Sequence, residues 1–173
     1  DEMVVEFDAF SAACVRANVE FGLLLAERLD FNGLVEGVEK TRAIFPFAAG
    51  RLALLNGNVV LVGNNAGVPV SHCIRDGAMA PCFALPLPAD IFDEVNGFAP
   101  SGEAPAKSAA LRIRLTDFED KQTLCVSFSH GLMDVASAGM MLAALAAICR
   151  GEAPDVTDVR VDRMVLPSTP GPG

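Results

Sequence analysis

The strongest candidate for chemistry in this sequence is His130. It follows Leu124, Val126 and Phe128 at every second position, so the period of a strand places its side chain on their face. If that face is the buried one, the imidazole points inward at the end of a strand. A neutral imidazole can take a proton from a hydroxyl or an amine close to neutral pH, which makes it a candidate general base. From spacing alone, a core histidine hydrogen-bonded to the backbone is the competing interpretation.

Asp134 lies four residues after His130, immediately before the apolar run Val135–Cys149. A carboxylate at this position can accept hydrogen bonds from the first free backbone N–H groups of a helix. The local sequence therefore favours an N-cap over an acid–base partner for His130, because Asp is already ionised at neutral pH. The second histidine, His72, has nothing to pair with in the sequence, and we assign it a structural role.

Other patterns of catalytic or metal-binding residues are missing from the sequence. It contains no P-loop, no Gly-rich dinucleotide fingerprint and no G-x-S-x-G elbow. Five cysteines show no C-x-x-C spacing, and with only two histidines they predict no metal site. The sequence also shows no secretory signal, so we interpret the cysteines as buried, reduced thiols of an intracellular protein. No permanently bound cofactor is expected.

A hairpin and a helix are expected to position His130 and Asp134. Apolar and polar residues alternate over 111–116 and again over 124–129, with a turn at Glu119-Asp120-Lys121 between them. The run Val135–Cys149 is apolar all round and ends at Arg150-Gly151. A helix without a polar face is expected to be buried on every side.

The segments upstream predict a mixture of helix and strand. After Asp30, which can cap it, an amphipathic helix of about four turns runs toward Pro46. The dipeptide Asn56-Gly57 predicts a type I′ turn between strands 51–55 and 58–62. The second half of residues 10–29 favours a strand, and another short strand is expected near Val68.

Two stretches of the sequence predict no regular structure. Residues 76–108 contain five prolines that interrupt any ladder or helix. The tail, 154–173, is rich in Pro and Gly and reads as an extended linker. We therefore expect one domain over residues 1–153, followed by this linker.

The composition indicates a domain with an apolar surface to cover. The 173 residues are 51% hydrophobic, have a mean hydropathy of +0.38 and carry a formal net charge of −9. The negative charge argues against nucleic acids and acidic membrane surfaces, which are bound through clustered Lys and Arg. No uncharged apolar run reaches the roughly 18 to 20 residues of a membrane span. A soluble protein is expected, with a second domain or subunit on its apolar face.

The residues around His130 resemble the HxxxD site of the BAHD family, the plant and fungal CoA-dependent acyltransferases. They read Val126-Ser127-Phe128-Ser129-His130-Gly131-Leu132-Met133-Asp134. Three further segments are similar to landmarks of the family and follow in the family's order. These are Phe45–Leu52 (FPFAAGRL, similar to YPLAGRL), Asn64–Val70 (NNAGVPV, similar to N-x-x-G-V-P-F) and Val161–Arg163 (VDR, similar to LDRS).

The resemblance implies a chloramphenicol-acetyltransferase-like half-domain of α/β (α+β) class, with a mixed β-sheet and packed helices. It also implies that His130 is the general base, removing a proton from an acceptor hydroxyl or amine that then attacks an acyl-CoA thioester. Acyl-CoA, as co-substrate, and a small-molecule acceptor would be the partners. The resemblance makes Asp134 structural at the site, paired with an arginine and pointing away from the histidine. No CoA-binding residue is assigned.

The sequence departs from the family pattern in three ways. Val135 stands where a glycine usually follows the aspartate. Family members are far longer, and this chain stops in the crossover, before the family's DFGWG segment. The C-terminal domain is therefore expected to be absent from this chain, together with the arginine that pairs with Asp134 and most of the CoA contacts.

Two functions stay open on this evidence. The first is an acyltransferase that depends on a second half, this half alone being inactive. The alternative is a non-catalytic half-domain that acts as a binding or structural subunit of a larger complex. The family resemblance implies a cytoplasmic protein, whereas a start at Asp1 also fits a plastid or other organelle after N-terminal processing.

Overall fold

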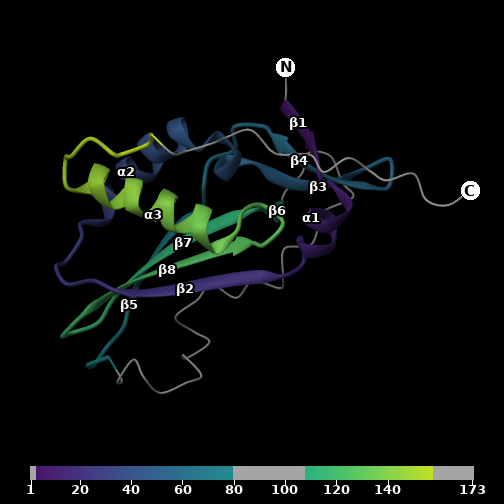
Figure 1. Ribbon diagram of the computed structural model, residues 1–173. Helices are drawn as coiled ribbons and strands as arrows, with labels where there is room; N and C mark the ends of the chain where they lie inside the picture. The colour runs from purple at the N-terminus through teal and green to yellow at the C-terminus, as the bar shows by residue number, and fades with distance from the viewer. Residues whose placement is uncertain (1–2, 80–107, 158–173) are drawn as a thin grey trace, which may run out of the picture.

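A computed structural model describes residues 3–79 and 108–157 of the chain. These residues form two four-stranded sheets with helices packed against them (Figure 1). The predicted α+β class with mixed sheet is confirmed. The strand pair expected to carry His130 lies in the centre of one sheet, so that sheet and the helices on it are the scaffold of the candidate site.

The sheet that carries His130 has the strand order β2-β8-β7-β5. Its strands are β2 (Asn18–Leu24), β5 (Val70–Ile74), β7 (Leu111–Asp117) and β8 (Gln122–Ser129). β2 and β7 both pair antiparallel with β8, whereas β5 pairs parallel with β7. The strand expected in the second half of residues 10–29 and the hairpin expected around 119–121 are both confirmed, and all eight residues of β8 are buried.

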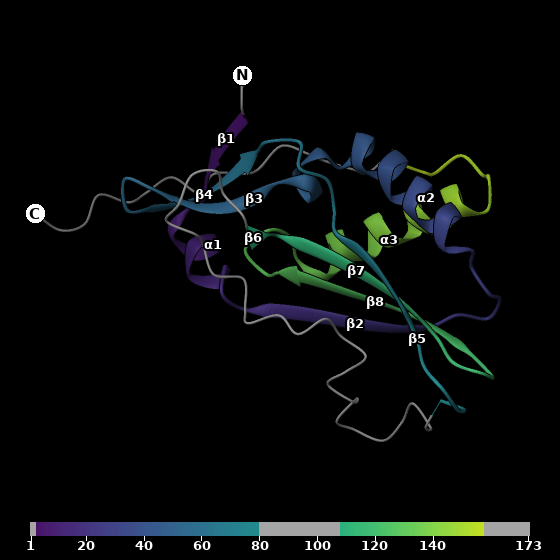
Figure 2. The same ribbon diagram turned by 180° about the vertical axis from the view of Figure 1, so that it is seen from behind.

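Two helices, α2 (Phe31–Ile44) and α3 (Val135–Cys149), lie side by side on one face of this sheet (Figures 1 and 2). Asp30 caps α2 as expected, accepting a hydrogen bond from the Gly33 N–H at 2.8 Å. The core between helices and sheet is formed by alternate residues of β7 and β8 and by one face of each helix. Its most buried members include Leu34, Leu111, Ile113, Leu115, Val126, Phe128 and Met141.

The second sheet has the strand order β1-β4-β3-β6. It is built from β1 (Met3–Glu6), β3 (Arg51–Leu55), β4 (Asn58–Gly63) and β6 (Ser108–Ala109). The predicted type I′ turn joins β3 to β4, with φ at 52° for Asn56 and 83° for Gly57. Two short elements lead into the sheets: α1 (Ala9–Cys14) before β2, and the 3₁₀ helix η1 (Pro46–Ala49) before β3.

The buried guanidinium of Arg51 ties β3 to the segment that precedes β5. It donates to the carbonyl oxygens of Ala49, Gly50, Ala66 and Gly67 at 2.9–3.1 Å. Burial lowers the pKa of Arg51 from its ordinary value, and the charge of Arg112 adds to that effect. These four acceptors keep the buried cation hydrogen-bonded, and they connect two of the family-like landmarks of the sequence in space.

The structure corrects the expectation that the last helix is buried on every side. The buried residues of α3 are Ala138, Met141, Ala144 and Leu145, all on the side that faces the sheet and α2. Its other side is exposed, with Val135 54% and Met140 37% accessible. The sequence pattern failed here because an alanine-rich helix has no polar stripe to mark its outer face, although small residues cost little when exposed.

Two expectations fall wholly or mostly outside the described residues. These are the irregular segment 76–108, of which residues 80–107 are not described, and the linker 154–173, described only to Thr157. The family-like segment Val161–Arg163 also lies there. Among residues 3–79 and 108–157, no helix is long and apolar enough to cross a membrane.

Gly37 allows α2 and α3 to approach each other closely. A Cβ at this buried position would lie 2.6 Å from the Sγ of Cys149 and 3.2 Å from a methyl group of Leu145. Around Gly139, on α3, no atom of the described residues outside its own helix turn lies within 4 Å of the corresponding point. The two glycines therefore give a matched pair, in which the same substitution meets a packed helix interface at one site and open space at the other.

We expect Gly37→Ala to destabilise the domain and Gly139→Ala to stabilise it. Alanine favours a helix by about 0.5–1 kcal/mol over glycine, but overpacking costs about 1–3 kcal/mol, so the clash dominates at Gly37 only. Urea denaturation of both variants measures the two free energies of unfolding. Equal stabilities for the two variants would contradict the close contact between α2 and α3.

Candidate active site

His130 lies in the turn between β8 and α3, one residue beyond the end of the strand. Its backbone N–H donates to the Ala17 carbonyl at 2.8 Å, which continues the pairing of β8 with β2. The neighbouring Leu132 and Met133 are 7% and 6% accessible and anchor the turn in the core. The chain thus leaves the centre of the sheet at His130 and reaches Asp134, the N-cap of α3, four residues later.

The imidazole of His130 is exposed, so the expectation of an inward-pointing side chain is wrong. Strand parity puts Leu124, Val126 and Phe128 on the helix-facing side, and all three are buried, but the strand ends at Ser129. Parity no longer applies in the turn that follows. Within the described residues the ring makes no hydrogen bond, which also removes the core-histidine interpretation.

Asp134 is the N-cap of α3, as its position predicts. Its Oδ1 accepts a hydrogen bond from the Ser137 N–H at 2.7 Å. Hydrogen bonds from the side chain and backbone of Ser137 lower the pKa of Asp134 from its ordinary value, and the nearby His130 contributes to the same effect. The carboxylate is therefore ionised at neutral pH and engaged with the helix, four residues from the imidazole.

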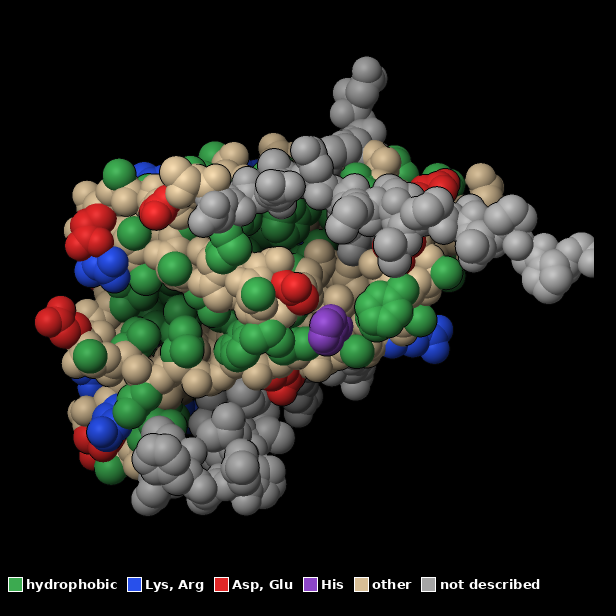
Figure 3. Space-filling view, in the orientation of Figure 1, with side chains coloured by type: hydrophobic (Ala, Val, Ile, Leu, Met, Phe, Trp, Pro, Cys, Tyr) green, Lys and Arg blue, Asp and Glu red, His purple; other side chains and the backbone are tan. Residues whose placement is uncertain are grey.

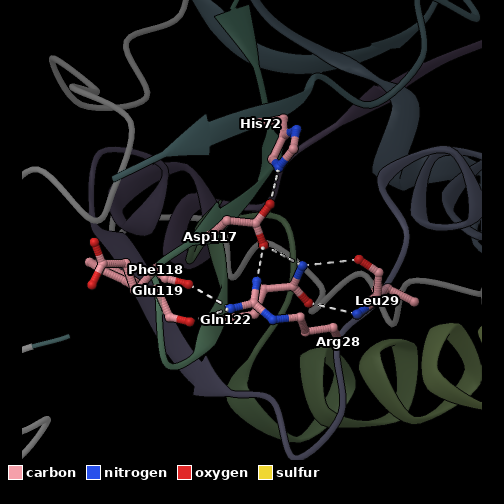
Figure 4. A network of polar contacts seen from close by, with 7 residues as sticks. All are labelled: Arg28, Leu29, His72, Asp117, Phe118, Glu119 and Gln122. Carbon is pink, nitrogen blue, oxygen red and sulfur yellow. Dashed lines mark hydrogen bonds and ion pairs between the residues drawn. The ribbon is translucent and has the colours of Figure 1, made fainter. Parts of the chain in front are cut away.

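His72 has a partner, which corrects the expectation that nothing pairs with it. Its Nε2 lies 2.7 Å from Oδ2 of Asp117 (Figure 4). Its ring also stacks on Phe31, with the ring centroids 4.9 Å apart. The parallel pairing of β5 with β7 brings His72 near Asp117, although 45 residues separate them in the sequence. A pairing of that range leaves no local signal in a single sequence.

Asp117 is the centre of a polar network that joins three segments (Figure 4). Its Oδ1 accepts from Arg28 at 3.2 Å and from Gln122 at 2.7 Å. Gln122 in turn bonds both the N–H and the carbonyl of Leu29. Partial burial opposes ionisation, but the hydrogen bonds from His72 and Gln122 and the charges of His72 and Arg28 lower the pKa of Asp117 overall.

The two histidines are not brought together. Gln122 begins β8 and Ser129 ends it, so the Asp117 network and the His130 turn lie at opposite ends of the central strand. The network fastens the connection between β2 and α2, and we regard it as structural. The described residues also contain no group of three or more His, Cys, Asp or Glu side chains that could hold a metal.

The depressed pKa of Asp117 predicts a pH dependence of stability. A carboxylate with a folded pKa below its unfolded value stabilises the fold above the unfolded pKa, and loses this effect as pH falls through the folded pKa. Wild type should thus be more stable than Asp117→Asn at pH 6, with the difference shrinking in the acid range, below about 4. Urea denaturation at several pH values measures it.

The control for this experiment is Glu119→Gln, in the same turn. The Glu119 side chain makes no hydrogen bond or ion pair within residues 3–79 and 108–157. Arg28 reaches this residue through its backbone carbonyl, at 3.1 Å, which the substitution keeps. This variant should follow wild type at all pH values. A constant difference between wild type and Asp117→Asn across the acid range would contradict the ionised role of Asp117.

Removing the cap of α3 should cost measurable stability. We expect Asp134→Ala to lower the free energy of unfolding by about 0.5–2 kcal/mol, the usual cost of losing an N-cap. Asp134→Asn keeps an oxygen that can accept from the Ser137 N–H, so it should stay close to wild type. Chemical denaturation distinguishes the two, and an Asn variant as unstable as the Ala variant would show that charge rather than capping matters.

Solved structures with this fold include two TRI101 proteins and vinorine synthase. TRI101 of F. sporotrichioides, complexed with coenzyme A and T-2, matches with a TM-score of 0.62 at 21% identity, over 87% of this chain and 42% of that one. TRI101 of F. graminearum, complexed with coenzyme A and deoxynivalenol, matches with a TM-score of 0.61 at 16% identity, over 87% and 39%. Vinorine synthase matches with a TM-score of 0.58 at 20% identity, over 88% and 42%.

These likenesses establish the fold, and this chain spans about 40% of the length of the proteins compared. No curated protein matches the sequence at a significant level. A sequence model of the Transferase family matches residues 33–172, which is most of the chain and includes the turn of His130 and the cap of α3. The chain therefore belongs to the Transferase family, the BAHD acyltransferase family that its motifs resemble.

Proposed function

We propose that the protein containing this chain transfers an acyl group from an acyl-CoA thioester to a hydroxyl or amine acceptor, with His130 as general base. The observation that carries the proposal is the position of this imidazole. It is exposed, unbonded within the described residues, and fixed through its backbone at the end of the central strand. Membership in the Transferase family supports the reaction class.

A general base needs a free nitrogen and access to the proton that it removes. The His72 ring fails this requirement, because its Nε2 is engaged with Asp117 at 2.7 Å and its face with Phe31. The His130 ring meets it. Its backbone N–H is bonded to Ala17 at 2.8 Å, so the side chain projects from a fixed point and can face a substrate.

The proposed reaction balances without a metal or a redox cofactor. A ring nitrogen of His130 takes the proton from the acceptor O–H or N–H, while the acceptor heavy atom attacks the thioester carbonyl carbon. The tetrahedral intermediate collapses, the C–S bond breaks, and the CoA thiolate leaves. The imidazolium gives its proton to the thiolate, which restores the neutral base and releases CoA together with the ester or amide.

Acyl-CoA enters this proposal as a co-substrate that binds and leaves, and no permanently bound cofactor is required. The TRI101 proteins of matching fold were solved in complex with coenzyme A, which supports a CoA thioester as the donor. Asp134 is proposed to act structurally. It caps α3 and so fixes the turn between itself and the base, and its remaining oxygen can accept from an arginine outside this chain.

We also propose that a second protein domain or subunit completes the site. The outer face of α3 exposes Val135 and Met140, at 54% and 37%. Hydrophobic side chains gather between few charged ones on this side of the molecule (Figure 3). A partner of this kind would remove apolar surface from water and would provide the opposite wall of a substrate channel.

The test of the proposed function is a pair of histidine variants in the natural protein that contains this chain. With acetyl-CoA and a panel of small alcohols, phenols and amines, release of the CoA thiol measures turnover. We expect His130→Ala to lower kcat by about 10²–10⁴, the usual contribution of a general base. His72→Gln, at the far end of the sheet, should stay near wild-type kcat.

The same experiment distinguishes the proposed acyltransferase from the non-catalytic alternative. Full turnover in His130→Ala would overturn the role of base. A protein that binds coenzyme A or an acceptor but turns over no tested acyl-CoA, with or without His130, would favour the alternative of a non-catalytic binding or structural half-domain.

A further inference from the structure

The residues on either side of His130 contact one short piece of backbone, the connection between α1 and β2 formed by residues 15–17. Ser129 is fully buried, and its hydroxyl donates to the Val15 carbonyl at 2.7 Å. The next residue, His130, donates its N–H to the Ala17 carbonyl at 2.8 Å. The last residue of β8 and the first residue of the turn are thus bonded to carbonyls two residues apart on the same connection.

Gly131 continues this contact by close packing. A Cβ at Gly131 would lie 2.6 Å from the Ser11 carbonyl oxygen and 2.6 Å from a methyl group of Val15. The turn therefore lies directly on α1 and the connection, with no room for a side chain between them. Val15 itself is 1% accessible, so this residue anchors the connection in the core, whereas Arg16 and Ala17 are exposed.

We infer that Ser129 is a positioning residue for His130, because its hydroxyl fixes the connection from which the His130 backbone is held. This inference rests on the proposed function, in which His130 is the base. Ser129 touches no substrate, since it is fully buried. It acts through Val15 and Ala17, which fix the position of the His130 backbone and therefore of its imidazole.

The energetic asymmetry of buried hydrogen bonds explains why the hydroxyl matters. Without it, the buried Val15 carbonyl has lost its side-chain donor, and a buried acceptor without a partner is costly. The connection would shift to recover a partner, and Ala17 and the His130 backbone would shift with it. A displacement of about 1 Å in a reacting group can cost about 10²-fold in rate, so a small movement of residues 15–17 is enough to reduce turnover.

Thr123→Val provides the matched control. Thr123 lies on the same strand and the same face as Ser129, is 3% accessible, and its hydroxyl has no hydrogen-bond partner among the described residues. Removing this hydroxyl deletes a buried polar atom of β8 without breaking a bond to the α1–β2 connection. Any general effect of losing a buried hydroxyl from the strand should therefore appear in both variants.

The experiment measures kinetics and the state of the imidazole in the natural protein that contains this chain. We expect Ser129→Ala to lower kcat about 10- to 100-fold, as misplacement of the base predicts, with KM for acetyl-CoA within about twofold. The ¹H–¹⁵N NMR signal of the His130 ring, identified by its loss in His130→Ala, should shift or broaden. Thr123→Val should leave both the kcat and the signal unchanged.

A second variant protects the test against a failure of Ser129→Ala to fold. Gly131→Ala keeps the Ser129 hydroxyl but pushes the turn away from Ser11 and Val15, and should change the His130 signal and kcat in the same direction. A folded Ser129→Ala or Gly131→Ala protein with a wild-type His130 signal and kcat would overturn the inference. If His130→Ala keeps full turnover, the proposed function fails instead, and the NMR signal alone decides whether Ser129 positions the ring.

Discussion

The pairing of β8 with strands on both of its sides is the constraint on which the rest of the described structure depends. Every residue of β8 is buried, because β2 and β7 cover its edges and α2 and α3 cover one of its faces. Val126, for example, pairs with Phe21 on one side and with Ile113 on the other. The position of His130 follows from this arrangement, since the turn begins where the fully paired strand ends.

Much of the fold could be predicted from the sequence because its signals are local. Alternation over 111–116 and 124–129 located β7 and β8, Asn56-Gly57 located a turn, and Asp30 and Asp134 marked the starts of α2 and α3. Each of these signals depends on residues that are neighbours in the sequence. Gly151, with φ at 75°, ends α3 for the same local reason.

The predictions from the sequence that were wrong have physical reasons as well. The outer face of α3 was predicted to be buried because hydrophobicity alone does not distinguish a small exposed alanine from a core residue. The direction of the His130 side chain depended on where β8 stops, and strand ends are set by tertiary pairing. The hydrogen bond between His72 and Asp117 required the parallel register of β5 with β7. The contact of Ser129 with Val15 spans 114 residues, and no local pattern reveals either contact.

That separation of 114 residues has a consequence for how the protein folds. The hydrogen bond from Ser129 to Val15, and with it the place of His130, can form only after two distant parts of the chain have met. Closing a loop of this length is entropically costly, and contacts of long sequence separation slow folding. The hairpin of β7 and β8 can form early from neighbouring residues, but the candidate site is assembled only when β2 is added to its edge. A partly folded chain would therefore contain the β7–β8 hairpin before it contains a positioned base.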